Sequence, residues 1–216
     1  MSQPQSLAAV FSERVRQLAQ KEAFRSPSAT GWTSLTWAQT DAQVRELAAG
    51  LLSLGLQREE RVALASATRV EWVLSDLAVI LAGGATTTVY PNTQATDVAY
   101  IVADSECVLA IVEDQAQLDK LRATRAQMPA LRTVIVIDTG GLGAPGDDGT
   151  WHDGWVISLE ELAQRGRDHL AAHPTAVDDA VAALQPEHLV TLIYTSGTTG
   201  RPKGVELTHK LSLIHI

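Results

Sequence analysis

Apolar residues near the N-terminus follow a helical pattern, which then changes to a pattern typical of strands. Between residues 6 and 24 they recur at spacings of three and four, which predicts an amphipathic helix. Residues 32–36 are predicted to form a short strand or one half of a hairpin. Thr36 and Gln39 have the spacing of a capping box. We therefore expect a second helix to begin there and to end near Leu54, with a glycine just beyond it.

From residue 61 onwards, short apolar blocks alternate with helical patterns. We predict strands over 61–66, 86–90, 107–112 and 131–137, and helices over 70–81, 97–103 and 115–127. This alternation is typical of βαβ units, in which helices connect the strands of a mostly parallel sheet. The run Val134–Ile137 is apolar at every position, as expected for a strand that is buried on both faces. The predicted fold class is therefore α/β, with a mostly parallel sheet flanked by helices.

The second half of the chain continues this order with longer polar connections. Residues 138–150 are rich in Gly, Asp and Pro and are expected to form an exposed, variable loop. A second capping box at Ser158 opens a helix that we expect to reach about His169. Residues 171–185 are acidic and rich in Ala, and are expected to cross the surface. The apolar run Leu189–Ile193 that follows predicts a buried strand, and no internal domain boundary is evident.

Composition and charge narrow the classes of function. The net charge of −8 and the pI of about 5.2 argue against non-specific binding to nucleic acid or to an anionic membrane. The single cysteine, Cys107, lies in an apolar run, which indicates a buried structural thiol in a reducing cytoplasm. We expect no signal peptide. The most apolar window, residues 72–85, contains Asp76 and is too short to span a bilayer.

The run from Tyr194 to Gly204 carries the most distinctive chemistry of the chain. Its small hydroxyl residues, glycines and single lysine can present backbone N–H groups, hydroxyls and an ammonium to one polyphosphate. The candidate nucleotide-binding residues are Thr195, Ser196, Gly197, Thr198, Thr199, Gly200 and Lys203. The glycines are too close together for a Walker A loop, and the run contains no dinucleotide fingerprint. The alternative is a surface loop without a ligand.

Over its whole length this run resembles the AMP-binding signature of the adenylate-forming superfamily, which comprises acyl-CoA synthetases, peptide-synthetase adenylation domains and luciferases. The flanking Val205–His209 continues the resemblance, and Val89–Thr93 resembles the same segment of bacterial long-chain fatty acid–CoA ligases. The resemblance implies that residues 1–210 are the N-terminal, incomplete part of the large domain of such a ligase. The alternatives are an adenylation domain for an amino or aryl acid, and a short, non-catalytic nucleotide-binding module.

The resemblance also implies substrates and residue roles. Such enzymes use ATP and Mg²⁺ to convert a fatty acid into an acyl-adenylate and pyrophosphate, and then transfer the acyl group to coenzyme A with release of AMP. By resemblance, residues 195–200 wrap the β- and γ-phosphates, and the Thr195 hydroxyl helps to hold Mg²⁺. Lys203 is the candidate catalytic residue, which neutralises the departing pyrophosphate; the alternative is that it only anchors the loop. Arg201 is expected to be a solvated loop charge, and His209 to cap or pack against the next element.

The last six residues, 211–216, differ in character from the rest of the chain. Leu-Ser-Leu-Ile-His-Ile is what CTG-TCT-CTT-ATA-CAC-ATC encodes, the end of a widely used transposase sequencing adapter, so we expect this tail to be non-native. The alternative is a genuine apolar strand. We expect the chain by itself to be inactive and prone to aggregation, because a sheet cut at its phosphate loop exposes an edge and an apolar face. The expected location is the cytoplasm. Peripheral contact with a membrane stays open because long acyl chains partition into lipid, and the pattern predicts no oligomeric state.

Overall fold

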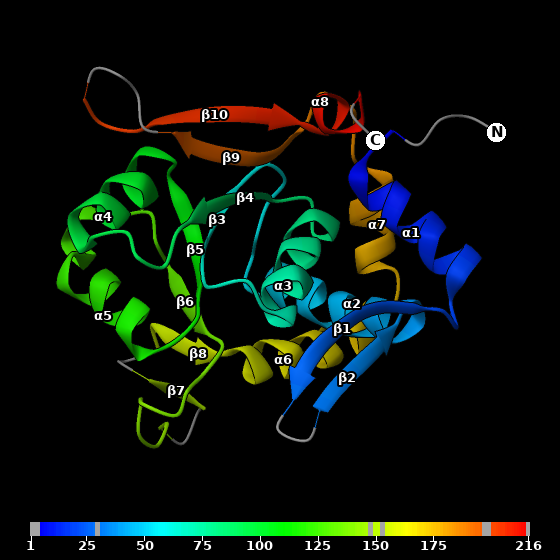
Figure 1. Ribbon diagram of the computed structural model, residues 1–216, viewed down its shortest axis with the longest axis horizontal. Helices are drawn as coiled ribbons and strands as arrows, with labels where there is room; N and C mark the ends of the chain where they lie inside the picture. The colour runs from blue at the N-terminus through cyan, green and yellow to red at the C-terminus, as the bar shows by residue number, and fades with distance from the viewer. Residues whose placement is uncertain (1–4, 29–30, 147–148, 152–153, 196–199, 215–216) are drawn as a thin grey trace.

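The computed structural model describes residues 5–28, 31–146, 149–151, 154–195 and 200–214, and its centre is a mixed sheet (Figure 1). The strands of this sheet are β3 (Arg61–Ala65), β4 (Ala85–Val89), β5 (Cys107–Val112), β6 (Thr133–Val136), β7 (Thr150–Trp151), β8 (Val156–Ser158), β9 (Leu189–Thr195) and β10 (Lys203–Thr208). They lie in the order β10-β9-β4-β3-β5-β6-β8-β7. The neighbours pair in parallel except at the two edges, where β10 pairs with β9 and β7 with β8 in antiparallel fashion. The predicted α/β class is confirmed.

Helices cover both faces of the sheet (Figure 1). On one face lie α2 (Trp37–Ser53), α3 (Val70–Leu81) and α6 (Leu159–Ala172), and on the other lie α4 (Ala95–Asp104) and α5 (Gln115–Ala123). The strands supply alternate residues to the two cores, so Leu64 of β3 belongs to the first core and Ala63 and Ala65 to the second. Burial on both faces explains why β5 and β6 are apolar at nearly every position.

The N-terminal helix is shorter than its apolar pattern predicts. It ends as α1 (Leu7–Leu18), because the following residues pair as strand β1 (Glu22–Ser28) with β2 (Gly31–Thr36). This antiparallel hairpin confirms the predicted half-hairpin and supplies its missing strand. Thr36 and Gln39 form both hydrogen bonds of the predicted capping box at the start of α2.

The alternating strands and helices between residues 61 and 137 follow the prediction closely. The predicted helix over 70–81 and strand over 107–112 have the boundaries of α3 and β5. The largest difference is in α5, which ends at Ala123 and is followed by a short 3₁₀ turn, η1 (Arg125–Gln127). The Thr124 hydroxyl donates a hydrogen bond to a backbone carbonyl of the last turn, a contact that competes with continuation of the helix.

Several elements of the second half go beyond the prediction. The expected surface crossing contains α7 (Ala176–Ala182), whose Val177 is fully buried, so part of this segment belongs to the core. β10 was not predicted, and neither were the short strands β7 and β8. Residues 209–214 form helix α8 (His209–Ile214), so residues 211–214 are helical rather than a strand, and the non-native origin of the tail stays a prediction. Within the described ranges, every helix falls short of the length or apolarity that a bilayer crossing requires.

His209 is the first residue of α8, and it packs against the N-terminal helix α1, a partner that the sequence did not predict. Its side chain is buried, and its Nδ1 accepts a hydrogen bond from the Leu7 backbone N–H at 3.3 Å. The His209 backbone N–H donates to the His188 carbonyl at 3.1 Å. Burial lowers the pKa of His209 to about 4; His188 acts in the same direction, and Glu59 opposes both.

Acid is expected to destabilise the contact between α8 and α1 that His209 makes. Below pH 6.5, the ordinary pKa of histidine, the unfolded chain binds a proton at His209 that the folded chain excludes. Stability is therefore expected to fall as the pH decreases from 6.5 to about 4, and to be independent of this residue above that window. His209→Asn keeps an acceptor for the Leu7 amide and is expected to flatten this part of a curve of thermal midpoint against pH. His173→Asn, at the exposed end of α6, is the control, and an unchanged slope in His209→Asn would contradict the assignment.

Candidate functional site

The candidate phosphate loop connects two antiparallel strands near one edge of the sheet (Figure 1). β9 leads into the loop, β10 leads out of it, and β9 also pairs in parallel with β4. Val190 and Leu192 of β9 are buried, whereas Ile193 is 40% exposed. The prediction of a buried strand is therefore correct for only part of β9, because this strand lies next to the edge strand rather than in the middle of the sheet.

The structure brings the two ends of the loop together. The predicted residues that lie outside the described ones are Ser196, Gly197, Thr198 and Thr199. Thr195 ends β9, Lys203 begins β10, and the two are direct cross-strand partners. Opposed residues of an antiparallel pair lie on the same face, so the exposed side chains of Thr195 and Lys203 leave the sheet on the same side at the mouth of the loop. Gly200 has a φ of 128°, which favours glycine at this position.

Two tyrosines and an aspartate hold the base of the loop against α4. The Tyr194 hydroxyl donates to Oδ2 of Asp104 at 2.7 Å, and the Tyr100 hydroxyl donates to the Pro202 carbonyl at 3.2 Å. The two rings meet edge to face, with centroids 6.4 Å apart. Burial, followed by the neighbouring Asp104 carboxylate, raises the pKa of Tyr194 well above its usual value. The hydroxyl therefore stays protonated and acts as a donor.

Arg201 lies over the ring of Tyr100. Its Cζ is 5.1 Å from the ring centroid, within the range of a cation–π contact. The side chain is exposed, as expected for a loop charge, but it is held in place rather than surrounded by solvent alone. Beside it lies a pocket of about 540 Å³, lined in part by Asp97 and Gln127. The Arg201 guanidinium is thus oriented by Tyr100 of α4.

Sequence reasoning missed Tyr100 and Asp104. The two residues are four positions apart and therefore lie on one face of α4, yet Tyr194 is 90 residues away from Asp104. Their neighbours Val98, Ala99, Ile101 and Val102 are buried. The apolar periodicity of this helix correctly indicates that Tyr100 and Asp104 lie away from the centre of the core. It does not indicate which segment they contact.

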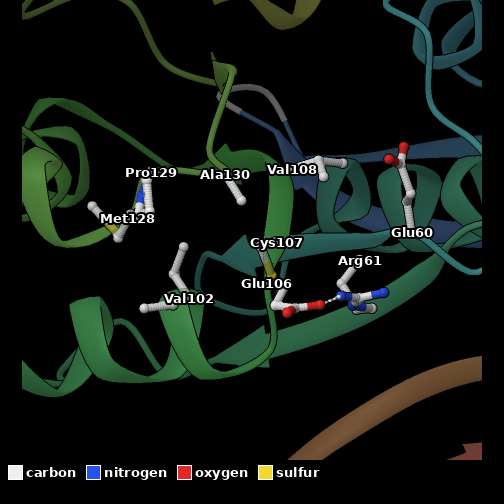
Figure 2. A pocket seen from close by; sticks show the side chains of 10 residues that line it. Glu60, Arg61, Val102, Glu106, Cys107, Val108, Met128, Pro129 and Ala130 are labelled. Atoms are coloured by element: carbon white, nitrogen blue, oxygen red, sulfur yellow. Dashed lines mark hydrogen bonds and ion pairs between the residues drawn. The ribbon is translucent and has the colours of Figure 1, made fainter.

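A second pocket, shown in Figure 2, lies where β3 and β5 begin, which is the end of these strands opposite to their carboxyl ends. Its volume is about 480 Å³, and its lining includes Arg61 at the start of β3 and Glu106 just before β5, which form an ion pair at 2.7 Å. Cys107 in its wall is fully buried, and burial raises the pKa of its thiol, which confirms the predicted buried thiol. Ligands of parallel α/β sheets bind outside the carboxyl ends of the strands. Thr195 lies at such an end and this pocket does not, so the loop is the candidate site.

The sequence has clear similarity to known proteins. A family model described as AMP-binding enzyme matches residues 11–215. The chain is 36% identical over 184 residues to the long-chain-fatty-acid–CoA ligase FadD15 of Mycobacterium bovis. This alignment covers 85% of the chain and 28% of the relative. It is 30% identical over 206 residues to the long-chain-fatty-acid–CoA ligase ACSBG2 of Xenopus laevis, covering 95% of this chain and 26% of the relative. The chain thus spans less than a third of the length of these relatives.

Solved structures share the fold. An anthranilate–CoA ligase, AuaEII, in complex with anthranoyl-AMP superimposes with a TM-score of 0.78 at 22% identity, covering 97% of this chain and 36% of that one. A fatty acyl-CoA synthetase of Mycobacterium tuberculosis superimposes with a TM-score of 0.70 at 22% identity. The superposition covers 94% of this chain and 34% of the synthetase chain. At these identities the likeness establishes the architecture of the sheet and its helices.

Proposed function

Because the chain belongs to the AMP-binding enzyme family, we propose that it supplies the ATP-phosphate loop of a ligase that joins a long-chain fatty acid to coenzyme A. In this reaction the carboxylate attacks the α-phosphate of ATP to give an acyl-adenylate and pyrophosphate, and the thiol of coenzyme A then displaces AMP. The observation that carries the proposal is the pairing of Thr195 with Lys203 at the mouth of a loop rich in glycine and hydroxyl residues. The similarity to long-chain-fatty-acid–CoA ligases supports this class of substrate.

In this proposal, Lys203 stabilises the negative charge that develops on the leaving pyrophosphate. Transfer at the α-phosphate moves negative charge onto the leaving pyrophosphate, and a fixed positive group nearby lowers the energy of that state. Lys203 is exposed at the start of β10, and its flexible stem lets the ammonium follow oxygens that shift during the reaction. Backbone N–H groups and hydroxyls of residues 195–200 bind the β- and γ-phosphates.

The exposed Thr195 hydroxyl is an oxygen donor that would suit a magnesium ion bound chiefly through phosphate. Among the described residues, no three or more His, Cys, Asp or Glu side chains are grouped as a metal site. Mg²⁺ is commonly held by few protein oxygens together with substrate phosphates and water. We assign the exposed Thr195 hydroxyl to this ion. When bound, Mg²⁺ neutralises part of the charge on the phosphate oxygens.

Exchange of labelled pyrophosphate into ATP tests the proposal. The product of the complete open reading frame that encodes this chain is expected to catalyse exchange with palmitate or oleate, and not with amino acids or anthranilate. Exchange with an amino or aryl acid alone would favour the adenylation-domain alternative. ATP binding without exchange for any acid would favour the nucleotide-binding module and reject the ligase.

The chain of 216 residues by itself is expected to catalyse no exchange when it is tested in parallel. It corresponds to 28% of the length of its FadD15 relative, and adenylate formation requires groups around the adenine, the ribose and the acyl carboxylate as well as a phosphate loop. Measurable turnover by this chain alone would contradict the expectation.

A further inference from the structure

Tyr100 contacts the loop at a point that determines the direction of Lys203. The Tyr100 hydroxyl donates to the carbonyl oxygen of Pro202 at 3.2 Å. That carbonyl and the N–H of Lys203 belong to one planar peptide unit, so a hydrogen bond to the first fixes the orientation of the second. The proline ring also restricts φ immediately before this unit. A side chain of α4 therefore sets the backbone from which the Lys203 side chain departs.

The ring of Tyr100 adds a second contact to the same segment. The Arg201 guanidinium carbon lies 5.1 Å from the ring centroid. Two consecutive residues of the loop, Arg201 and Pro202, thus rest on one aromatic side chain. This arrangement requires both the hydroxyl and the ring, which distinguishes tyrosine from the other residue types at this position.

The other end of the loop is held by the same face of α4. Asp104, one helical turn beyond Tyr100, accepts the hydrogen bond from Tyr194 at 2.7 Å. The Tyr194 ring lies against β10 at Gly204, where an added Cβ would approach the ring to 3.0 Å. Glycine at this position therefore leaves room for the ring. The strand that enters the loop and the strand that leaves it are both tied to α4.

We propose that Tyr100 and Asp104 are positioning residues that hold the two ends of the phosphate loop and fix the place of Lys203 relative to ATP. Tyr100 acts through Pro202, and Asp104 acts through Tyr194. The inference rests on the proposed function of the loop. Displacement of a reacting group by about 1 Å can cost as much as about a hundredfold in rate, even when the change is made away from the chemistry.

Tyr100→Phe tests the proposal because it keeps the ring and removes the hydroxyl. In the product of the complete open reading frame, we expect kcat/KM for ATP to fall by about tenfold in pyrophosphate exchange, with KM for palmitate and the thermal midpoint unchanged. Ser53→Ala is the matched control, since the Ser53 hydroxyl also donates to a backbone carbonyl, that of Gly50 at 2.7 Å in α2. If kcat/KM for ATP falls, KM for palmitate rises and the thermal midpoint falls together in Tyr100→Phe, the role of Tyr100 is merely structural and the proposal is overturned.

Amide hydrogen exchange gives a readout that does not depend on catalysis. The backbone amides of Gly200, Arg201 and residues 203–205 are expected to exchange several-fold faster in Tyr100→Phe than in the wild-type protein or in Ser53→Ala. Equal exchange rates in all three proteins would overturn the positioning role. A wild-type protein that is inactive with every acid would reject the proposed ligase, and the exchange rates would then decide by themselves whether Tyr100 holds the loop.

Discussion

Lys203→Ala, in the product of the complete open reading frame, is expected to lower pyrophosphate exchange by about a hundredfold or more. Negative charge moves onto the leaving pyrophosphate in the transition state, and loss of one well-placed stabilising group typically costs about 10²–10³ in rate. The Lys203 side chain is exposed beside Thr195, so its truncation leaves no cavity. The thermal midpoint is therefore expected to stay nearly unchanged, and the assay compares kcat at saturating ATP and palmitate.

Two further variants separate the chemical role of Lys203 from an anchoring role. Lys21→Ala changes the net charge by the same amount at an exposed position after α1, and is expected to leave the exchange rate unchanged. Lys203→Arg keeps the charge but replaces a compact ammonium with a planar group, and is expected to recover only part of the rate. If Lys203→Ala lowers the midpoint and leaves kcat intact, the lysine only anchors the loop.

Local signals account for the elements that could be predicted from the sequence. The capping box of Thr36 and Gln39 lies within four residues, and the apolar periodicity of α3 fixes both of its ends. Strand β1 could not be predicted from local sequence signals. The apolar residues at helical spacing end at Leu18, and pairing with β2 makes the segment around Phe24 a strand. That pairing is a tertiary contact, which overrides the local pattern.

The loop was recognisable because its chemistry is concentrated in one run, whereas its support is spread over the chain. Tyr100 contacts Pro202 across 102 residues, and no local pattern in α4 distinguishes a tyrosine in solvent from one that holds a loop. β10 was missed for a related reason. It begins with Lys203 and Gly204, and glycine is depleted in strands. The Tyr194 ring beside Gly204 explains the glycine, and this contact becomes visible only when β9 and β10 are paired.

Gly166→Ala is expected to force two core helices apart and to lower the thermal midpoint by at least roughly 5 °C. α2 and α6 approach so closely that a Cβ on Gly166 would lie 1.7 Å from the Glu46 carbonyl oxygen and 2.9 Å from the Gly50 nitrogen. Gly50 is constrained from its own side, because a Cβ there would lie 2.2 Å from the Leu162 carbonyl oxygen. These atoms belong to the backbone, so a change of side-chain rotamer cannot relieve the overlap.

Helix propensity acts in the opposite direction and is the smaller effect. Alanine is favoured over glycine in a helix interior by about 1 kcal/mol. Separation of the packed helices costs about 3 kcal/mol or more, because Leu162, which is fully buried in this core, loses its close packing. Gly140→Ala is the matched control: in this exposed loop the added Cβ meets a side-chain oxygen of Asp138 at 3.2 Å, and the midpoint is expected to change little. A thermal midpoint for Gly166→Ala at or above the wild-type value would contradict this expectation. It would mean that α2 and α6 can move apart without loss of packing, and that the higher helix propensity of alanine determines the stability of the variant.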